Sequence, residues 1–214
     1  MNAVFTLPDG STVKKPYGTT PADIAESIGP ALARDAVAAR IDGTLMDLNV
    51  SLEQDAEVEI VTSDSEEGLE ILRHSTAHVM ACAINRLYSD VKFGIGPAIE
   101  DGFYYDFDLP ESISADHLER IGEEMARIRS EELPFERTEM PVYEAREIME
   151  ERGQTYKLEL LDEMEEETVS LYSTGDFVDL CRGPHIPHTG KTPPFSLLSV
   201  AGAYWRGSEE NPQL

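Results

Sequence analysis

The sequence has little of several features that define common classes of protein. Its only cysteines are Cys82 and Cys181 in 214 residues, so disulfides do not build the fold and a reducing, cytoplasmic location is expected. No run of about 20 apolar residues is present, which predicts no membrane-spanning helix and no membrane partner. The first residues carry no basic run ahead of an apolar stretch, so we expect no secretory signal.

Basic residues are also scarce, because 17 Lys and Arg stand against 42 Asp and Glu, for a formal net charge of −25. Such a charge repels phosphate backbones on average, so any contact with nucleic acid must be local or supplied by another partner. An acidic, highly soluble proteome is the simpler explanation of the charge. Apolar residues make up 41% of the chain, and this length favours two domains, one small and one medium.

Residues 1–62 have the pattern of a small β-grasp unit, in which a mixed sheet wraps over one helix. Thr20 and Pro21 are typical of an N-cap and first helical turn, and Gly29-Pro30 ends the apolar periodicity that follows them. Turn chemistry at 8–11 and 42–43 separates strand-like segments. The expected strands are 4–7, 11–15, 36–41, 44–47 and 58–62.

Residues 63–214 have the pattern of a larger α+β unit with an antiparallel-rich sheet. Ser63 and Glu66 have capping-box spacing, and apolar residues then recur at helical spacing through Leu87. A second helix is expected after a Ser114 cap, a third over 142–152 ending at Gly153, and a solvated acidic helix end over 162–167. The expected strands are 92–99, 103–109, 169–173, 177–181 and 195–203.

Two spaced motifs carry most of the chemistry. His74-Ser75-Thr76-Ala77-His78 falls in the first of these helices, so its imidazoles stand at i and i+4 on one face, beside the buried stripe and able to border a cleft. Cys181-Arg182-Gly183-Pro184-His185 is broken by Gly-Pro, which presents Cys181 and His185 from a strand end or loop. A His pair facing a Cys/His pair can hold a metal ion or polarise a water molecule. Either arrangement indicates hydrolysis.

Other interpretations of these residues exist. Zinc accepts imidazole and thiolate ligands, but Ser75 stands where a zinc protease has a glutamate, so a protease is not expected. Cys181 beside His185 could act as a nucleophile, whereas a helical His pair alone is more often structural. We interpret Cys82, one turn beyond His78, as a packing residue.

Two glycine-containing motifs fail as nucleotide sites. Gly190-Lys191-Thr192 resembles the end of a phosphate loop, but Pro193-Pro194 forbids the helix that must follow. Gly94-Ile95-Gly96-Pro97 lacks the third glycine of a dinucleotide fingerprint, so we expect these glycines to let backbone approach another segment closely.

The same motifs carry a family resemblance. The strings Leu72–His78, Phe93–Ala98 with Gly102–Phe107, Asp179–His185 and Ala201–Gly207 together resemble the N-terminal region of bacterial threonyl-tRNA synthetases. The resemblance implies a TGS domain over 1–62 and an editing domain, shared with alanyl-tRNA synthetases, over 63–214. The class II catalytic core and anticodon-binding domain of the family would then be absent, so aminoacylation, ATP, Mg²⁺, the core zinc and homodimerisation are expected only of a full-length member.

The function that the resemblance implies is proofreading, the hydrolysis of seryl-tRNA(Thr), with the tRNA acceptor end and its serine as partners. The family's editing-site residues match His74, His78, Lys157, Asp179, Cys181 and His185. We expect His74 and Lys157 to act on the attacking water and Asp179 to bind the serine amino or hydroxyl group, while Cys181 and His185 shape the pocket. Without the resemblance, Lys157 would be read as a solvated lysine on an acidic helix.

We expect no cofactor and no tightly bound metal. Two alternatives are a free-standing, zinc-dependent aminoacyl-tRNA deacylase, because alanyl-type relatives place zinc among these residue types, and a non-catalytic RNA-binding or regulatory module.

Overall fold

The computed structural model describes residues 1–110 and 113–214, and this part of the chain divides into two compact units. The first unit comprises residues 1–75 together with 183–187, and the second comprises 76–182 together with 188–214. The boundary passes through one continuous helix, α3 (Glu66–Leu87). No described helix is long and apolar enough to cross a membrane.

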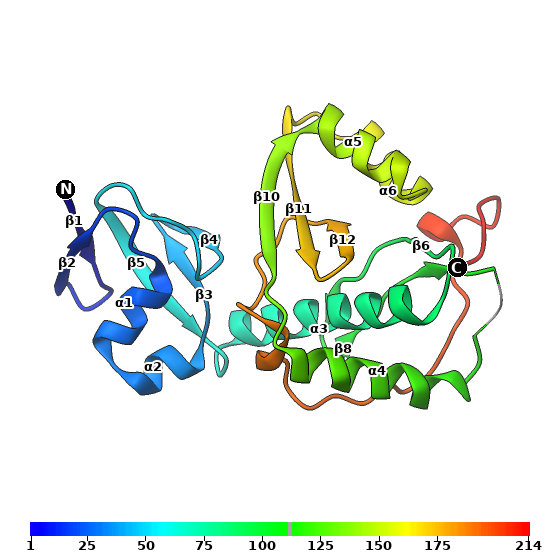
Figure 1. The fold of residues 1–214 in the computed structure, drawn as a ribbon, viewed down its shortest axis with the longest axis horizontal. Coiled ribbons are helices and arrows are strands. Elements are labelled where there is room, and N and C mark those ends of the chain that lie inside the picture. The colour runs from blue at the N-terminus through cyan, green and yellow to red at the C-terminus, as the bar shows by residue number, and fades with distance from the viewer. Residues whose placement is uncertain (111–112) are drawn as a thin grey trace. The chain divides into compact units, whose positions relative to one another are not determined.

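The first unit is built on a five-stranded mixed sheet (Figure 1). Its strand order is β2-β1-β5-β3-β4, with β1 antiparallel to β2 and parallel to β5, so the predicted β-grasp fold is confirmed. The apolar core lies between sheet and helix, where Phe5, Ile24 and Ala39 are fully buried. The elements of this unit are β1 (Asn2–Thr6), β2 (Thr12–Pro16), α1 (Pro21–Ile28), α2 (Pro30–Asp35), β3 (Ala36–Ile41), β4 (Thr44–Met46) and β5 (Ala56–Thr62).

Helix α1 begins where the sequence predicts. The Thr20 hydroxyl accepts a hydrogen bond from the Asp23 amide at 3.2 Å, and the Asp23 carboxylate accepts one from the Thr20 amide at 2.8 Å, which completes a capping box. Helix α2 was not predicted, because Pro30 was read as a stop. In the structure Pro30 occupies the first turn of a new helix, where its missing N–H costs nothing.

The second unit combines helices with short sheets (Figure 1). Its largest sheet has three antiparallel strands in the order β10-β11-β12. Strand β12 alternates buried and half-buried residues, which turns Asp179 inward beside Phe177. Besides the shared α3, the elements are β6 (Lys92–Phe93), β7 (Ala98–Ile99), β8 (Gly102–Phe103), β9 (Phe107–Asp108), α4 (His117–Glu131), β10 (Glu136–Pro141), α5 (Val142–Glu151), α6 (Thr155–Asp162), β11 (Thr168–Thr174), β12 (Phe177–Leu180), and the 3₁₀ turns η1 (Thr189–Lys191) and η2 (Trp205–Gly207).

Several predicted strands differ from the structure. Segments 92–99 and 103–109 each break into two short strands, which pair as β6 with β9 and β7 with β8. The predicted strand 195–203 is wrong, because this segment is extended without strand pairing in the described structure. The proline pair 193–194 lacks amide donors, and Leu198 is 87% exposed, so the segment offers no buried face to a sheet.

Helix starts show a second kind of difference. The cap of α3 is Ser65, whose hydroxyl accepts the Gly68 amide at 3.0 Å, and the predicted Ser63 cap is therefore wrong. Helix α4 begins at His117, three residues after the predicted Ser114 cap, and the Ser114 amide donates to His117 Nδ1 at 3.0 Å instead. The structure also contains β10, which the sequence patterns did not reveal, and the acidic helix expected to end over 162–167 is α6, which ends at Asp162.

Glycine 68 allows a close backbone approach at the start of α3, and this gives a stability prediction. A Cβ atom there would overlap the carbonyl oxygen of Thr62, whereas a Cβ atom at the helical Gly122 would meet open space. We expect Gly68→Ala to lower the free energy of unfolding by about 1–3 kcal/mol through this overlap. The matched control Gly122→Ala should raise it by about 0.5–1 kcal/mol, because alanine favours the helix. Urea unfolding followed by circular dichroism measures both, and an equal response of the two variants would contradict the prediction.

Candidate active site

The two histidines of the first motif lie one turn apart on helix α3, as predicted. His78 is 3% exposed, and His74 is half-buried. Cys181 follows the last residue of β12 and is half-buried, while His185, four residues later, is fully buried. Ligand atoms from His74, His78, Cys181 and His185 all lie within 4.8 Å of one another, so the chain contains a His/Cys cluster of the kind that can hold a metal ion.

Within the first unit, His185 is fixed by the helix residue between the two motif histidines. Ser75 Oγ lies 3.0 Å from His185 Nδ1 and accepts the Ile186 amide N–H at 3.1 Å. The His74 and His185 rings are stacked, with centroids 4.6 Å apart and an interplanar angle of 15°. Ser75 Oγ has one donor and two acceptor lone pairs, so beside the Ile186 amide it can either donate to His185 Nδ1 or accept from it, depending on the tautomer of His185.

A buried charge network forms the centre of the second unit. Lys157 Nζ lies 2.6 Å from Asp179 Oδ1, and the two side chains are only 4% and 3% exposed. His78 Nε2 lies 3.6 Å from Asp179 Oδ2, and the Tyr105 hydroxyl donates to the same oxygen at 2.5 Å. Lys157 Nζ also donates to the Tyr105 oxygen at 3.2 Å. Three elements, α3, α6 and β12, therefore meet at one carboxylate.

Tyr105 is the residue that joins this network to the apolar core. Its burial, reinforced by the neighbouring Asp179 charge, raises the pKa of Tyr105 well above its usual value, so the phenol stays protonated and remains a donor. Its ring packs at right angles to Phe93 at 5.9 Å. A Cβ atom at Gly96 would overlap this ring, and the Gly94 amide bonds to the Asp106 carbonyl at 2.9 Å, so the predicted close approach at both glycines is confirmed.

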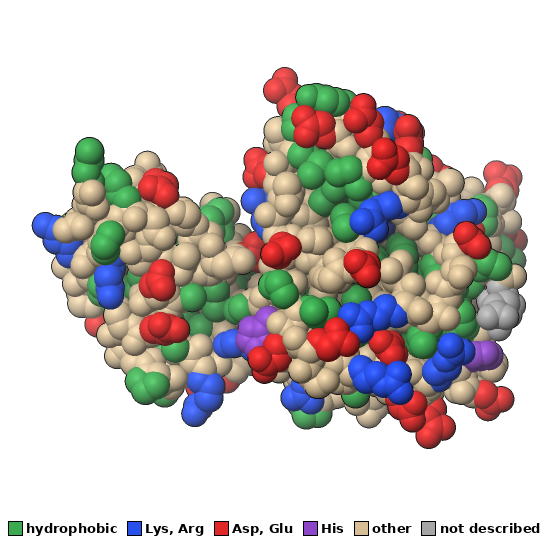
Figure 2. All heavy atoms as spheres, viewed as in Figure 1, with side chains coloured by type: hydrophobic (Ala, Val, Ile, Leu, Met, Phe, Trp, Pro, Cys, Tyr) green, Lys and Arg blue, Asp and Glu red, His purple; other side chains and the backbone are tan. Residues whose placement is uncertain are grey.

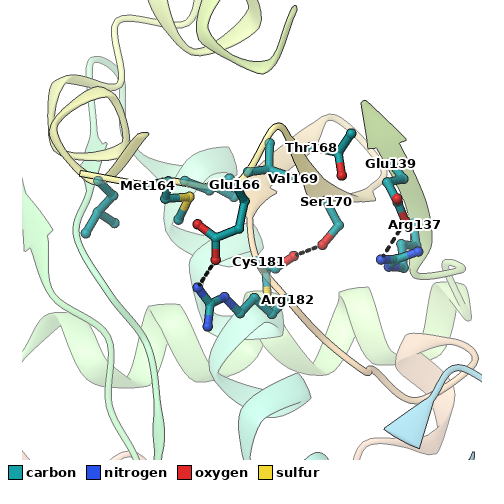
Figure 3. A pocket seen from close by; sticks show the side chains of 11 residues that line it. Arg137, Glu139, Met164, Glu166, Thr168, Val169, Ser170, Cys181 and Arg182 are labelled. Carbon is teal, nitrogen blue, oxygen red and sulfur yellow. Dashed lines mark hydrogen bonds and ion pairs between the residues drawn. The ribbon is translucent and has the colours of Figure 1, made fainter. Parts of the chain in front are cut away.

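A pocket of about 280 Å³ opens beside Cys181 (Figure 3). Its apolar wall includes Met164 and Val169. Two arginines at its edge are each paired with a carboxylate, Arg182 with Glu166 at 2.9 Å and Arg137 with Glu139 at 3.1 Å. The pocket is lined by Arg137, Glu139, Leu160, Met164, Glu166, Thr168, Val169, Ser170, Leu180, Cys181 and Arg182. The second unit thus offers a concave surface in which the arginine charges are locally balanced.

Sequence reasoning found most of these residues but missed three. Lys157 is buried, so its interpretation as a solvated lysine is wrong. Cys82 is buried and its thiol donates to the Thr174 carbonyl at 3.5 Å, which confirms a packing role, and burial raises the pKa of Cys82 to about 11. Ser75, Tyr105 and Asp47 were not singled out. The first two lie inside the quoted motifs, but Asp47 lies in the β-grasp region with no motif of its own.

The donor set of the His/Cys cluster suits zinc, which accepts three imidazoles and one thiolate. The contact between His185 Nδ1 and Ser75 Oγ leaves Nε2 as the ring nitrogen that would bind a metal. Nδ1 can donate its proton to Ser75 Oγ, which has a second acceptor lone pair beside the one used by the Ile186 amide. The residues of the cluster therefore fit a zinc ion in their chemistry.

Comparisons with known proteins indicate which class of protein the chain resembles. Residues 3–62 match the TGS domain, and residues 169–214 match the threonyl and alanyl tRNA synthetase second additional domain. The chain therefore combines a TGS domain with the additional domain that these synthetases share.

Individual relatives narrow the class further. The chain is 52% identical over 213 residues to a threonine–tRNA ligase of Halalkalibacterium halodurans, 51% identical over 211 residues to one of Bacillus velezensis, and 53% identical over 209 residues to one of Staphylococcus aureus. These matches cover 97–98% of this chain but only 32–33% of each relative. The chain corresponds to the N-terminal TGS and editing-domain region of threonyl-tRNA synthetases, and it spans about a third of the length of the curated relatives it matches.

The buried ion pair gives a stability prediction. Lys157→Met would leave the Asp179 carboxylate buried without its cation, which should lower the free energy of unfolding by about 3–5 kcal/mol. The matched control is Lys92→Met, because Lys92 is 42% exposed and pairs with Asp108 at 3.5 Å, and its replacement should cost under about 1 kcal/mol. Urea unfolding measures both. A Lys157→Met/Asp179→Asn double variant should recover part of the loss, and equal effects of the two single Lys→Met changes would contradict the prediction.

Proposed function

We propose that this chain removes serine from mischarged seryl-tRNA(Thr) by hydrolysing the ester between serine and the terminal ribose. Water adds to the ester carbonyl, the bond to the ribose oxygen breaks, and that oxygen takes up a proton, so serine and free tRNA are released. The observation that carries the proposal is the buried Lys157–Asp179 pair beside His78, within a chain that matches threonine–tRNA ligases over 98% of its length. Charged groups are almost never this buried unless they are paired, and such pairs recur at functional sites.

The need for such a reaction follows from the chemistry of the amino acids. Serine differs from threonine by the loss of one methyl group, which a binding pocket discriminates by only about 1–3 kcal/mol. Translation needs a far larger ratio, so a second site must accept the smaller amino acid and exclude the larger one. We propose that the residues of the His/Cys cluster accept the hydroxymethyl group of serine and reject the extra methyl of threonine.

Lys157 is proposed to act on the reacting atoms. An ammonium group has three donors, and two of them are used on Asp179 and Tyr105 within the described structure. The third can hold the attacking water or stabilise the oxyanion and the departing ribose oxygen. A neutral imidazole of His74 or His78 is suited to accept the proton of that water near pH 7.

The remaining site residues are proposed to bind the serine and to shape its pocket. Asp179 pairs with Lys157 and holds it in place, and we retain its predicted role in binding the serine amino or hydroxyl group, which would take over one of its present contacts. Cys181 and His185 are proposed to line the serine pocket. Nucleophilic attack by Cys181 is not part of the proposal, because water alone accounts for the hydrolysis.

The pocket beside Cys181 is proposed to receive the acceptor end of the tRNA. Figure 2 shows many Asp and Glu side chains on the surface, with Lys and Arg among them. Because the net charge is −25, a phosphate needs a local cation, and we propose that Arg137 and Arg182 at the pocket supply two by exchanging their present glutamate partners for phosphate. We expect weak, salt-dependent tRNA binding by this chain and action in the cytoplasm, where charged tRNA is used.

The substrate and the residue roles are tested together by incubating the chain with seryl- and threonyl-tRNA(Thr). Seryl-tRNA should be hydrolysed and threonyl-tRNA largely spared. Lys157→Ala and His74→Ala should each lower kcat/KM by about 100-fold or more, because each removes a proton-transfer or oxyanion contact. Lys92→Ala and His117→Ala, which alter a half-exposed lysine and a histidine outside the site, serve as controls. Full activity of both site variants would contradict the proposed residue roles, whereas tRNA binding without any hydrolysis by wild type would favour a non-catalytic RNA-binding module.

The His/Cys cluster favours one further candidate, a zinc-dependent deacylase acting on the same kind of substrate. Zinc analysis of the purified chain, before and after treatment with a strong chelator, separates the two mechanisms. We expect less than stoichiometric zinc and no loss of seryl-tRNA hydrolysis after chelation, because Lys157 and a neutral histidine supply the proposed proton transfer and oxyanion contact without a metal. Stoichiometric zinc, with activity lost on chelation and restored by added Zn²⁺, would establish the zinc-dependent reaction.

A further inference from the structure

The residue Asp47 lies in the β-grasp fold, directly after strand β4, but its carboxylate contacts the second site motif. Asp47 Oδ1 accepts a hydrogen bond from the backbone N–H of His185 at 2.8 Å. Both residues are buried, at 8% and 1% exposure, and both belong to the first compact unit. A TGS residue therefore reaches the backbone that carries one of the cluster histidines.

Two consecutive amides of this segment are held in the same way. Asp47 accepts the N–H of His185, and Ser75 accepts the N–H of Ile186 at 3.1 Å. The acceptors come from different elements, Asp47 from the end of β4 and Ser75 from helix α3. Together they leave the segment 183–187 little freedom to shift along its own direction or to rotate.

The imidazole of His185 depends on this backbone position. Its ring stacks on His74 with centroids 4.6 Å apart, and its Nδ1 lies 3.0 Å from Ser75 Oγ. A shift of the His185 backbone would break both contacts, because the stacking distance and the hydrogen bond tolerate only small displacements. Asp47 thus acts on the ring of His185 through the main chain.

Burial of an acidic residue at this position needs an explanation. Carboxylates are rarely this buried unless they are paired or hydrogen-bonded, because removing their charge from water is costly. A charged acceptor forms a shorter and stronger hydrogen bond to a backbone amide than a neutral one. Asp47 therefore suits a position where a loop must be held firmly.

We propose that Asp47 is a positioning residue for the editing site, so that the TGS domain contributes directly to hydrolysis by fixing the backbone of His185. This inference rests on the proposed function. It assigns to the β-grasp domain a task beyond binding a partner, and it predicts that damage to one residue of that domain lowers the rate of a reaction catalysed elsewhere in the chain.

The test compares four proteins, wild type, Asp47→Ala, Asp47→Asn and Asp55→Ala, in seryl-tRNA(Thr) hydrolysis. Asp47→Ala should lower kcat by about tenfold or more with little change in KM, because it misplaces His185 without touching the tRNA. Asp47→Asn keeps an oxygen acceptor and should restore most of the rate. Asp55→Ala is the matched control, since its carboxylate also accepts a backbone amide, that of Val4 at 2.7 Å, within the same sheet.

Amide hydrogen exchange of segment 183–187 provides the second readout. The His185 amide should exchange slowly in wild type and in Asp55→Ala, and faster in Asp47→Ala. Wild-type activity in Asp47→Ala would overturn the proposal. Fast exchange of the His185 amide in wild type would also overturn it, and this second measurement needs only wild type, so it is informative even if Asp47→Ala does not fold. If wild type itself fails to hydrolyse seryl-tRNA, the proposed function is wrong, and the exchange data still decide whether Asp47 holds the segment.

Discussion

The buried contact between Lys157 and Asp179 is the interaction on which the second unit depends. Neither charge is tolerated alone away from water, so the ion pair holds Lys157 Nζ of helix α6 2.6 Å from Asp179 Oδ1 of strand β12. Tyr105 and His78 then complete the coordination of the carboxylate. An apolar pair of the same shape would hold the two elements together at least as well. The presence of a charged pair rather than an apolar pair at this position is therefore better explained by chemistry than by stability.

The side chains of the candidate site come from segments that are far apart in the chain, and a different structural feature positions each of them. Helix α3 brings two histidines to one face by its own periodicity. Strand β12 turns Asp179 inward by alternation, and the close approach at Gly96 admits the ring of Tyr105. The segment 183–187 has no regular structure of its own and is held through its amides by Ser75 and Asp47. The segment 183–187, which has no regular structure, is thus held in place by hydrogen bonds to other parts of the chain.

The sequence predicted correctly those features that depend on interactions between residues close together in the chain. The capping box at Thr20, the β-grasp strands and the spacing of His74 and His78 depend on neighbours within a few residues, and these predictions agree with the structure. The burial of Lys157 depends on Asp179, 22 positions away, so local pattern suggested a solvated lysine. The prediction of a strand over 195–203 is wrong for the opposite reason. Its composition suits a strand, but no partner strand pairs with it in the described structure.

The tautomer of His185 decides whether its ring can donate to a substrate oxygen or can bind a metal. If Ser75 donates to Nδ1, the proton on Nε2 makes the ring a donor toward the cluster, which suits recognition of an oxygen of the substrate and opposes a metal. If Nδ1 donates to Ser75 instead, Nε2 carries the lone pair and can accept a proton or bind a metal. Ser75 also accepts the Ile186 amide, and Asp47 accepts the neighbouring amide of His185. The position of the His185 ring is therefore coupled to a hydrogen bond made by the TGS domain.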